Sequence, residues 1–113
     1  MSFRPPRSLG PGPAEIAFDA LQHEIMQERA STLGRLTREF ETALAALSAF
    51  DTDERPAAEA RARREDLLDS AADALWWFVV QREACGLRNT EAMLRDYKVP
   101  AAVRLRMGVV RKR

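Results

Sequence analysis

The sequence of 113 residues has a single cysteine and a single histidine, and only five glycines. The one cysteine, Cys85, excludes an internal disulfide and a cysteine-rich zinc site. No apolar run approaches the roughly 20 residues that a bilayer-spanning helix needs, because the most apolar run, residues 71–80, contains Asp73. Residues 1–13 also lack the apolar segment of a signal peptide. These absences predict a soluble, cytoplasmic protein that does not contact a membrane.

What the sequence does have is an apolar stripe of helical period from Phe18 to Phe50. Apolar side chains recur about every 3.6 residues, and the only polar residue on the stripe is Arg29. No proline lies between Pro13 and Pro56. The pattern predicts one amphipathic helix from about Pro13 to Phe50, roughly 55 Å long, which needs a partner along its whole length.

A second helix is predicted from about Pro56 to Cys85, with Gly86 as its left-handed cap. The turn at residues 51–55 is short, so the two helices should be antiparallel neighbours. Residues 75–80 are apolar on every face of this helix. Such a segment is expected to be buried on every face, so something besides the first helix must cover it.

The last third of the chain predicts two short helices, one from Asn89 or Thr90 to about Tyr97 and one from Pro100 to Met107. We expect one or both to fold back over residues 76–80 and to bury Trp76 or Trp77. The cluster that would form the core or a subunit interface is Trp76, Trp77, Phe78 and Val80. A tryptophan pair can also stack on a nucleobase, but core or interface is the better interpretation.

The predicted fold class is therefore all-α, a long antiparallel helical hairpin with one or two short C-terminal helices. The helices are too long and too apolar for a lone hairpin to cover, which predicts a bundle formed by a homodimer. A single helical domain at residues 14–108 lies between a proline-rich basic arm at residues 1–13 and a basic tail at residues 109–113.

Charge is unevenly distributed along the chain despite a net charge of +1. All 17 acidic residues lie between Glu15 and Asp96, whereas residues 98–113 contain basic residues and no acidic one. Because a hairpin returns the chain to its starting end, we expect the two basic ends to meet near the tryptophan cluster. The C-terminal candidates for binding an anion are Arg104, Arg106, Arg111, Lys112 and Arg113.

The basic ends have three interpretations. They could bind nucleic acid or another phosphate, they could pair with the acidic turn of a second copy, or they could simply be soluble tails. The acidic turn holds Asp51, Asp53 and Glu54. Nucleic acid is not favoured, because the short, proline-broken C-terminal helices offer no helix that could read a groove.

No catalytic residue and no cofactor is predicted. His23 has no second ligand or nucleophile at a useful spacing, which favours a position on the surface. An alternative metal site would combine two carboxylates of the first helix with two of the second. Its members are Glu24, Glu28, Asp69 and Asp73. If these four converge they could hold Mg²⁺, and if they point to solvent they form an ordinary acidic face.

A resemblance to a known enzyme family supports the alternative that the protein is a Mg²⁺-dependent enzyme. The segments Asp73-Ala-Leu-Trp-Trp, Gly86-Leu87 and Glu91-Ala-Met-Leu resemble the later helices of MazG-type all-α nucleotide pyrophosphohydrolases. That group binds Mg²⁺ with a Glu-x-x-Glu pair and a Glu-x-x-Asp pair. Here Asp66-x-x-Asp69 stands for the second pair, and the first has a different spacing, Glu24-x-x-x-Glu28. The resemblance implies Mg²⁺-dependent nucleotide hydrolysis.

A closer resemblance is to a small bacterial family of uncharacterised all-helical proteins. It rests on Gln81-Arg-Glu-Ala-Cys-Gly-Leu-Arg, Arg95-Asp-Tyr-Lys-Val-Pro and Arg106-Met-Gly. It implies no activity. The predicted function is thus a non-catalytic structural or protein-interaction module. Nucleotide hydrolysis and weak anion binding through the basic ends are the alternatives.

Overall fold

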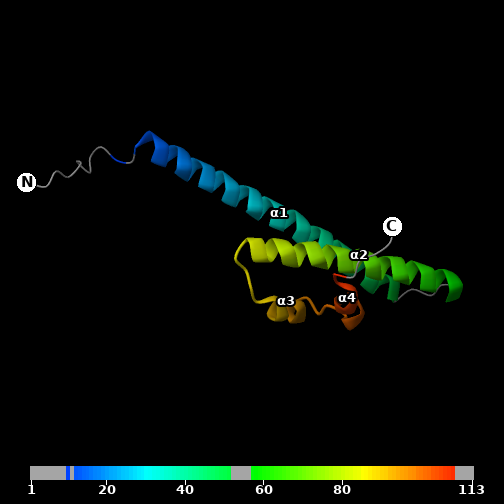
Figure 1. Cartoon of the computed structure of the whole chain (residues 1–113). Helices are drawn as coiled ribbons and strands as arrows, with labels where there is room; N and C mark the ends of the chain where they lie inside the picture. Colours follow the sequence, from blue (N-terminus) through cyan, green and yellow to red (C-terminus); the bar gives the residue numbers. More distant parts are fainter. Residues whose placement is uncertain (1–9, 11, 52–56, 109–113) are drawn as a thin grey trace, which may run out of the picture.

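The computed structural model describes residues 10, 12–51 and 57–108, and the secondary structure within them is entirely helical. In Figure 1, the two longest helices lie side by side and the two short ones lie together along one side of the second. The bounds are α1 Pro13–Asp51, α2 Ala57–Ala84, α3 Thr90–Asp96 and α4 Ala101–Arg106. The predicted all-α class is confirmed, including its two long packed helices and its two short C-terminal helices.

Each predicted helix agrees with the structure to within about a residue at either end. Most of the predicted turn, residues 52–56, lies outside the described residues, as do residues 1–9 and 109–113. Among the described helices, none combines the length and the apolar character that a membrane span requires.

Contacts at two levels show how α1 and α2 are aligned. Near the turn, Arg64 Nε donates a hydrogen bond to Asp51 Oδ1 at 3.1 Å. Near the other end of α2, Gln81 Nε2 donates to the backbone carbonyl of Arg29 at 3.2 Å. α1 therefore continues beyond the end of α2 for roughly four helical turns. We name this segment, residues 13–28, the overhang; it is the blue end of α1 that projects from the molecule in Figure 1.

The core lies where the four helices meet, away from the overhang. The first buried residue of α1 is Leu36, more than half-way along the helix. The largest fully buried side chains come from α1, α2 and α4: Phe40, Leu47, Leu68, Leu75, Phe78 and Val103. α3 adds Met93 and Leu94 to this cluster.

Three aromatic rings join the hairpin to the C-terminal segment. The Tyr97 ring lies 5.5 Å from Phe40 and 5.9 Å from Phe78, edge-on to both. Its hydroxyl donates to Glu41 Oε1 at 3.3 Å. Edge-to-face rings attract one another through their quadrupoles, so these contacts help to hold the end of α3 against both long helices.

Two helices end in the same backbone motif. After α2, the Leu87 amide donates to the Arg82 carbonyl and the Gly86 amide to the Glu83 carbonyl, with Gly86 at φ 83°. This is the predicted left-handed glycine cap. After α3, Lys98 occupies the equivalent position at φ 52°, which the sequence did not indicate because lysine rarely adopts that conformation.

Candidate interaction surface

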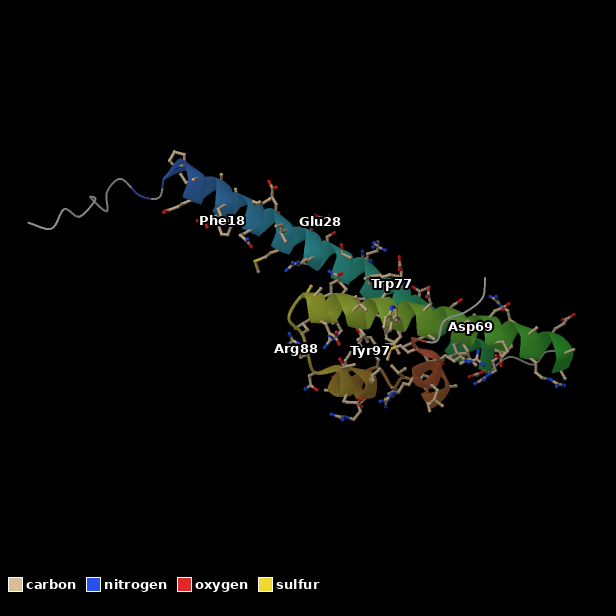
Figure 2. All side chains as sticks on the ribbon, in the orientation of Figure 1. Phe18, Glu28, Asp69, Trp77, Arg88 and Tyr97 are labelled. Atoms are coloured by element: carbon tan, nitrogen blue, oxygen red, sulfur yellow. The ribbon has the colours of Figure 1, made fainter. Side chains whose placement is uncertain are left out.

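The overhang carries a bare apolar stripe. Its exposed large side chains are Ile16, Phe18, Leu21 and Met26. Phe18, at 60% exposure, and Leu21, at 53%, continue the stripe that is buried in the core at Leu36 and Phe40. Figure 2 shows Phe18 on the projecting part of α1, away from the other helices. A single stripe is thus covered along one half of α1 and exposed to solvent along the other.

The overhang is also acidic. Glu15, Asp19, Glu24 and Glu28 are all exposed, and no lysine or arginine occurs between Pro13 and Glu28. His23 lies on the same segment and is exposed, which agrees with the predicted surface position. The overhang therefore presents an apolar stripe between carboxylates, a surface that suits a partner with an apolar floor and basic edges.

A groove between α1 and α2 offers such a floor. It has a volume of about 460 Å³, and none of its lining residues belongs to α3 or α4. We name it the hairpin groove. Its lining is Arg35, Arg38, Glu39, Thr42, Ala43 and Ala46 from α1 with Leu67, Ser70 and Ala74 from α2. Small side chains leave room for the close approach of another helix. The charged lining residues are two arginines and one glutamate, and Arg35 Nη1 pairs with Glu39 Oε1 at 3.0 Å.

Neither of the two tryptophans of α2 is buried. Trp76 is 43% exposed and Trp77 is 52% exposed, so the prediction that one of them is buried is wrong. Phe78 is buried as expected, whereas Val80 is exposed. α3 and α4 cover only the side of α2 that carries Phe78, and successive helical side chains point about 100° apart. The two short helices are too narrow to cover every face of residues 76–80.

Trp76 and Trp77 differ in their surroundings. A β-carbon placed on Gly108 would lie 3.3 Å from Cζ3 of Trp76, so the end of the described chain packs against that ring. Trp77 follows Ala74 by one helical turn and therefore continues the α2 side of the hairpin groove. Its side chain points about 100° away from that of Phe78, which Tyr97 contacts.

A second, smaller crevice of about 240 Å³ lies where the overhang leaves the hairpin. Its lining is Met26, Arg29, Ala30, Leu33, Ala84 and Cys85. The half-buried Cys85 thiol lies 3.8 Å from the carbonyl of Arg29 and 3.8 Å from Gln81 Nε2. These contacts place the thiol at the junction between the helices as a packing group.

The alternative metal site does not form. Glu24 and Glu28 lie on the exposed overhang, and Figure 2 shows Glu28 far along the molecule from Asp69. Asp69 Oδ1 instead accepts a hydrogen bond from Arg106 Nη1 at 3.0 Å. In the part of the chain that the structure describes, no three His, Cys, Asp or Glu side chains gather closely enough to hold a metal ion.

The two described members of the basic set are already paired within the chain. Arg104 Nη2 donates to both carboxylate oxygens of Glu91, at 3.0 and 3.1 Å. Arg106 donates to Glu65 and to Asp69. The hydrogen bond to Glu65 is the main cause that raises the pKa of Arg106 above its ordinary value. Arg111, Lys112 and Arg113 lie outside the described residues.

The expected meeting of the two basic ends is also wrong for the described residues. Arg106 binds Glu65 and Asp69 in the first half of α2, so α4 lies towards the turn. α1 begins at the opposite end, at the tip of the overhang (Figure 1). The expectation considered only the two long helices, whereas α3 and α4 carry the chain back along α2. Basic side chains of α4 thereby neutralise part of the acidic face of α2.

Sequence reasoning missed the hairpin groove. Its floor depends on small residues that recur at helical spacing on both helices, Ala43 and Ala46 on α1 with Ser70 and Ala74 on α2. That repetition is visible in the sequence and could have indicated a face open to another helix. Nothing in the sequence pattern singled out Arg35 and Arg38, which also line the groove.

A family model described as a family of unknown function, DUF6665, matches residues 12–113, which contain all four helices. The predicted resemblance to a family without a known activity is confirmed. No curated protein and no solved structure matches the chain.

Proposed function

Because the chain belongs to the DUF6665 family, whose description assigns no activity, we propose its function from its surface. The protein is a non-catalytic interaction module that acts as a homodimer, and the overhang is its docking element. The observation that carries this proposal is the apolar stripe of α1, which is covered in one half of the helix and bare in the other.

Exposing the apolar side chains of the overhang to water is unfavourable in free energy. Burying a side chain such as Phe18 or Leu21 contributes roughly 1.5–3 kcal/mol relative to leaving it exposed. A helix of four turns without tertiary contacts is also marginally stable, since most helical stability in proteins comes from packing of the apolar face. A partner that covers the stripe would stabilise the overhang on both counts.

A second copy of the chain is the occupant that the charges favour. The overhang is apolar and acidic. The hairpin groove of the same chain is apolar and has a net positive lining, because Arg38 is present in addition to the Arg35–Glu39 pair. Every copy thus carries both members of a complementary pair of surfaces. One chain cannot use both on itself, because the overhang and the α1 side of its own groove belong to one continuous helix.

The other candidate functions have less support. Metal-dependent nucleotide hydrolysis needs converging carboxylates, and Glu28 is remote from Asp69 (Figure 2). Anion binding needs free cations, and Arg104 and Arg106 pair with carboxylates of their own chain. No specific observation on the described residues favours either of these two functions.

Light scattering after size-exclusion chromatography tests the proposal. The wild type should have about twice the chain mass of 12.7 kDa at micromolar concentration. Phe18→Asp should shift the protein towards the monomer, with the dimer dissociation constant raised at least tenfold because apolar burial is lost in both copies. Leu105→Asp is a matched control, since Leu105 is 79% exposed but lies on α4. A wild type that remains monomeric would overturn the proposal.

A further inference from the structure

We infer that the overhang of each copy lies in the hairpin groove of the other, which makes a reciprocal antiparallel dimer. This inference rests on the proposed homodimer and specifies its arrangement. A two-fold axis relates the copies, so both grooves are filled and both overhangs are covered in one closed assembly.

The continuity of the stripe supports this arrangement. Along its second half, α1 presents the stripe to its own α2. Consider a two-fold axis perpendicular to α1, placed near the point where α2 ends. This axis places the partner's α2 beside the overhang, on the side of α1 that also faces its own α2. One side of α1 then contacts an α2 helix along its entire length, its own beyond Arg29 and the partner's before it. This explains why the stripe does not stop where the hairpin stops.

The lengths of the segments support the same axis. The α1 residues that line the groove run from Arg35 to Ala46, and the overhang comprises residues 13–28. Antiparallel pairing that centres one on the other is symmetric about Ala30 and Ser31, within two residues of Arg29. That is where Gln81 and Cys85 contact α1 and where α2 ends. The C-terminal end of each α2 thus lies close to the axis, where Ala84 and Cys85 line a crevice with Met26 and Arg29.

The side chains fit the register that this axis imposes. Phe18 and Leu21 come to the level of the small side chains of the partner's groove, with Leu21 opposite Ala74. Glu24 comes to the level of Thr37 and within one helical turn of both Arg35 and Arg38. Trp77, which the monomer leaves half exposed, is covered by the partner's overhang. Glu24 of the overhang thus meets the positive part of the groove, where Arg38 adds a cation to the Arg35–Glu39 pair.

Disulfide trapping tests the register. In a Cys85→Ser background, a chain with both Leu21→Cys and Ala74→Cys should oxidise to a covalent dimer held by two disulfides. No such bond can form within one chain, because Leu21 lies on the overhang beyond the end of α2. Ala17→Cys with Ser70→Cys, one turn away, should give the same product and keeps the test valid if Ala74→Cys fails to fold.

The single variants and the product size distinguish the alternatives. Ala74→Cys alone should stay reduced, and so should Leu21→Cys alone. A covalent dimer from Leu21→Cys alone would mean that the two overhangs pair with each other, which overturns the groove arrangement but leaves the homodimer standing. A ladder of covalent oligomers from the double variant would mean head-to-tail contacts and would also overturn it. A monomeric wild type would remove both proposals.

A charge exchange tests the chemistry independently. Arg38→Glu should weaken the dimer severalfold, Glu24→Arg should also weaken it, and the two changes combined should recover most of the loss. Arg95→Glu is the matched control, because Arg95 is an exposed arginine on α3. Its dimer should dissociate as the wild type does. Failure of the combined variant to recover would contradict the pairing of these residues.

Discussion

Tyr97 shows how a single side chain of the C-terminal segment depends on both long helices. Its ring packs edge-on against Phe40 of α1 and Phe78 of α2, and its hydroxyl donates to Glu41. Burial is the main cause that raises the pKa of the Tyr97 hydroxyl above 10.0, and the Glu41 carboxylate acts in the same direction. Arg82, whose guanidinium lies 5.7 Å from the Phe78 ring centre, lowers it.

The titration of Tyr97 can be followed alone, because it is the only tyrosine. We expect the tyrosinate absorbance of the native protein to titrate with a midpoint above pH 10, and that of the urea-unfolded protein at about 10. Since the native pKa is the higher one, the native state holds the proton more tightly. The stability this contributes is complete below the unfolded pKa and is lost as pH rises through the native pKa.

Two variants control this experiment. Tyr97→Phe keeps the ring contacts. It should remove the part of the decrease in the free energy of unfolding at alkaline pH that comes from ionisation of Tyr97. Glu41→Gln should lower the native midpoint without bringing it to the unfolded value, because burial remains the larger cause. A native midpoint at 10 would show that the Tyr97 hydroxyl is solvated and that α3 does not dock as described.

At the scale of the elements, α2 and α3 end in the same left-handed cap, which is a glycine after α2 and a lysine after α3. Gly86 and Lys98 both have positive φ, at 83° and 52°. A β-carbon added at Gly86 would meet nothing within 4 Å, so substitution there changes only the backbone energy. Gly86→Ala should lower the free energy of unfolding by about 1–2 kcal/mol, and Lys98→Gly should raise it by about 0.5–1 kcal/mol.

Urea denaturation at one protein concentration measures both changes. Lys98→Ala is the control, since it removes the lysine charge but keeps the β-carbon, and it should not stabilise the protein. If Lys98→Gly and Lys98→Ala were equally stable, the left-handed conformation at residue 98 would not be strained.

The elements also show where sequence reasoning succeeds and where it fails. The helix bounds follow from local signals, such as the proline at position 13 and the glycine at position 86, and these were predicted closely. The exposure of Trp77 depends on which face of α2 the short helices α3 and α4 pack against. That choice is set by long-range contacts, such as Arg106 with Asp69 and Tyr97 with Phe40, which no local pattern contains.

The same limit applies to the candidate site. The apolar stripe was predicted, and so was its need for a partner along the whole helix, because periodicity reports which side chains share a face. Its division into a covered and a bare half depends on where α2 lies against α1, at Gln81 and Arg29. The hairpin groove depends on that same alignment, so neither surface could be located before the packing was known.

At the scale of the whole molecule, the structure separates a packed body from a projecting helix. The core residues of α1 begin at Leu36, whereas the overhang has no buried residue. Cooperative packing protects backbone amides from exchange, while a helix without tertiary contacts opens readily. The two halves of α1 should therefore differ in stability although they form one continuous helix.

Hydrogen exchange at two protein concentrations should reveal that difference. Below the dimer dissociation constant, amides of residues 13–28 should exchange almost as fast as in an unfolded chain, while amides of residues 36–47 stay protected. Well above that concentration, both segments should be protected, because the partner covers the overhang. In Phe18→Asp the overhang should exchange rapidly at both concentrations, and Leu105→Asp should behave as the wild type. Strong protection of residues 13–28 that does not change with concentration would mean that the overhang is stable alone and that its helix needs no partner.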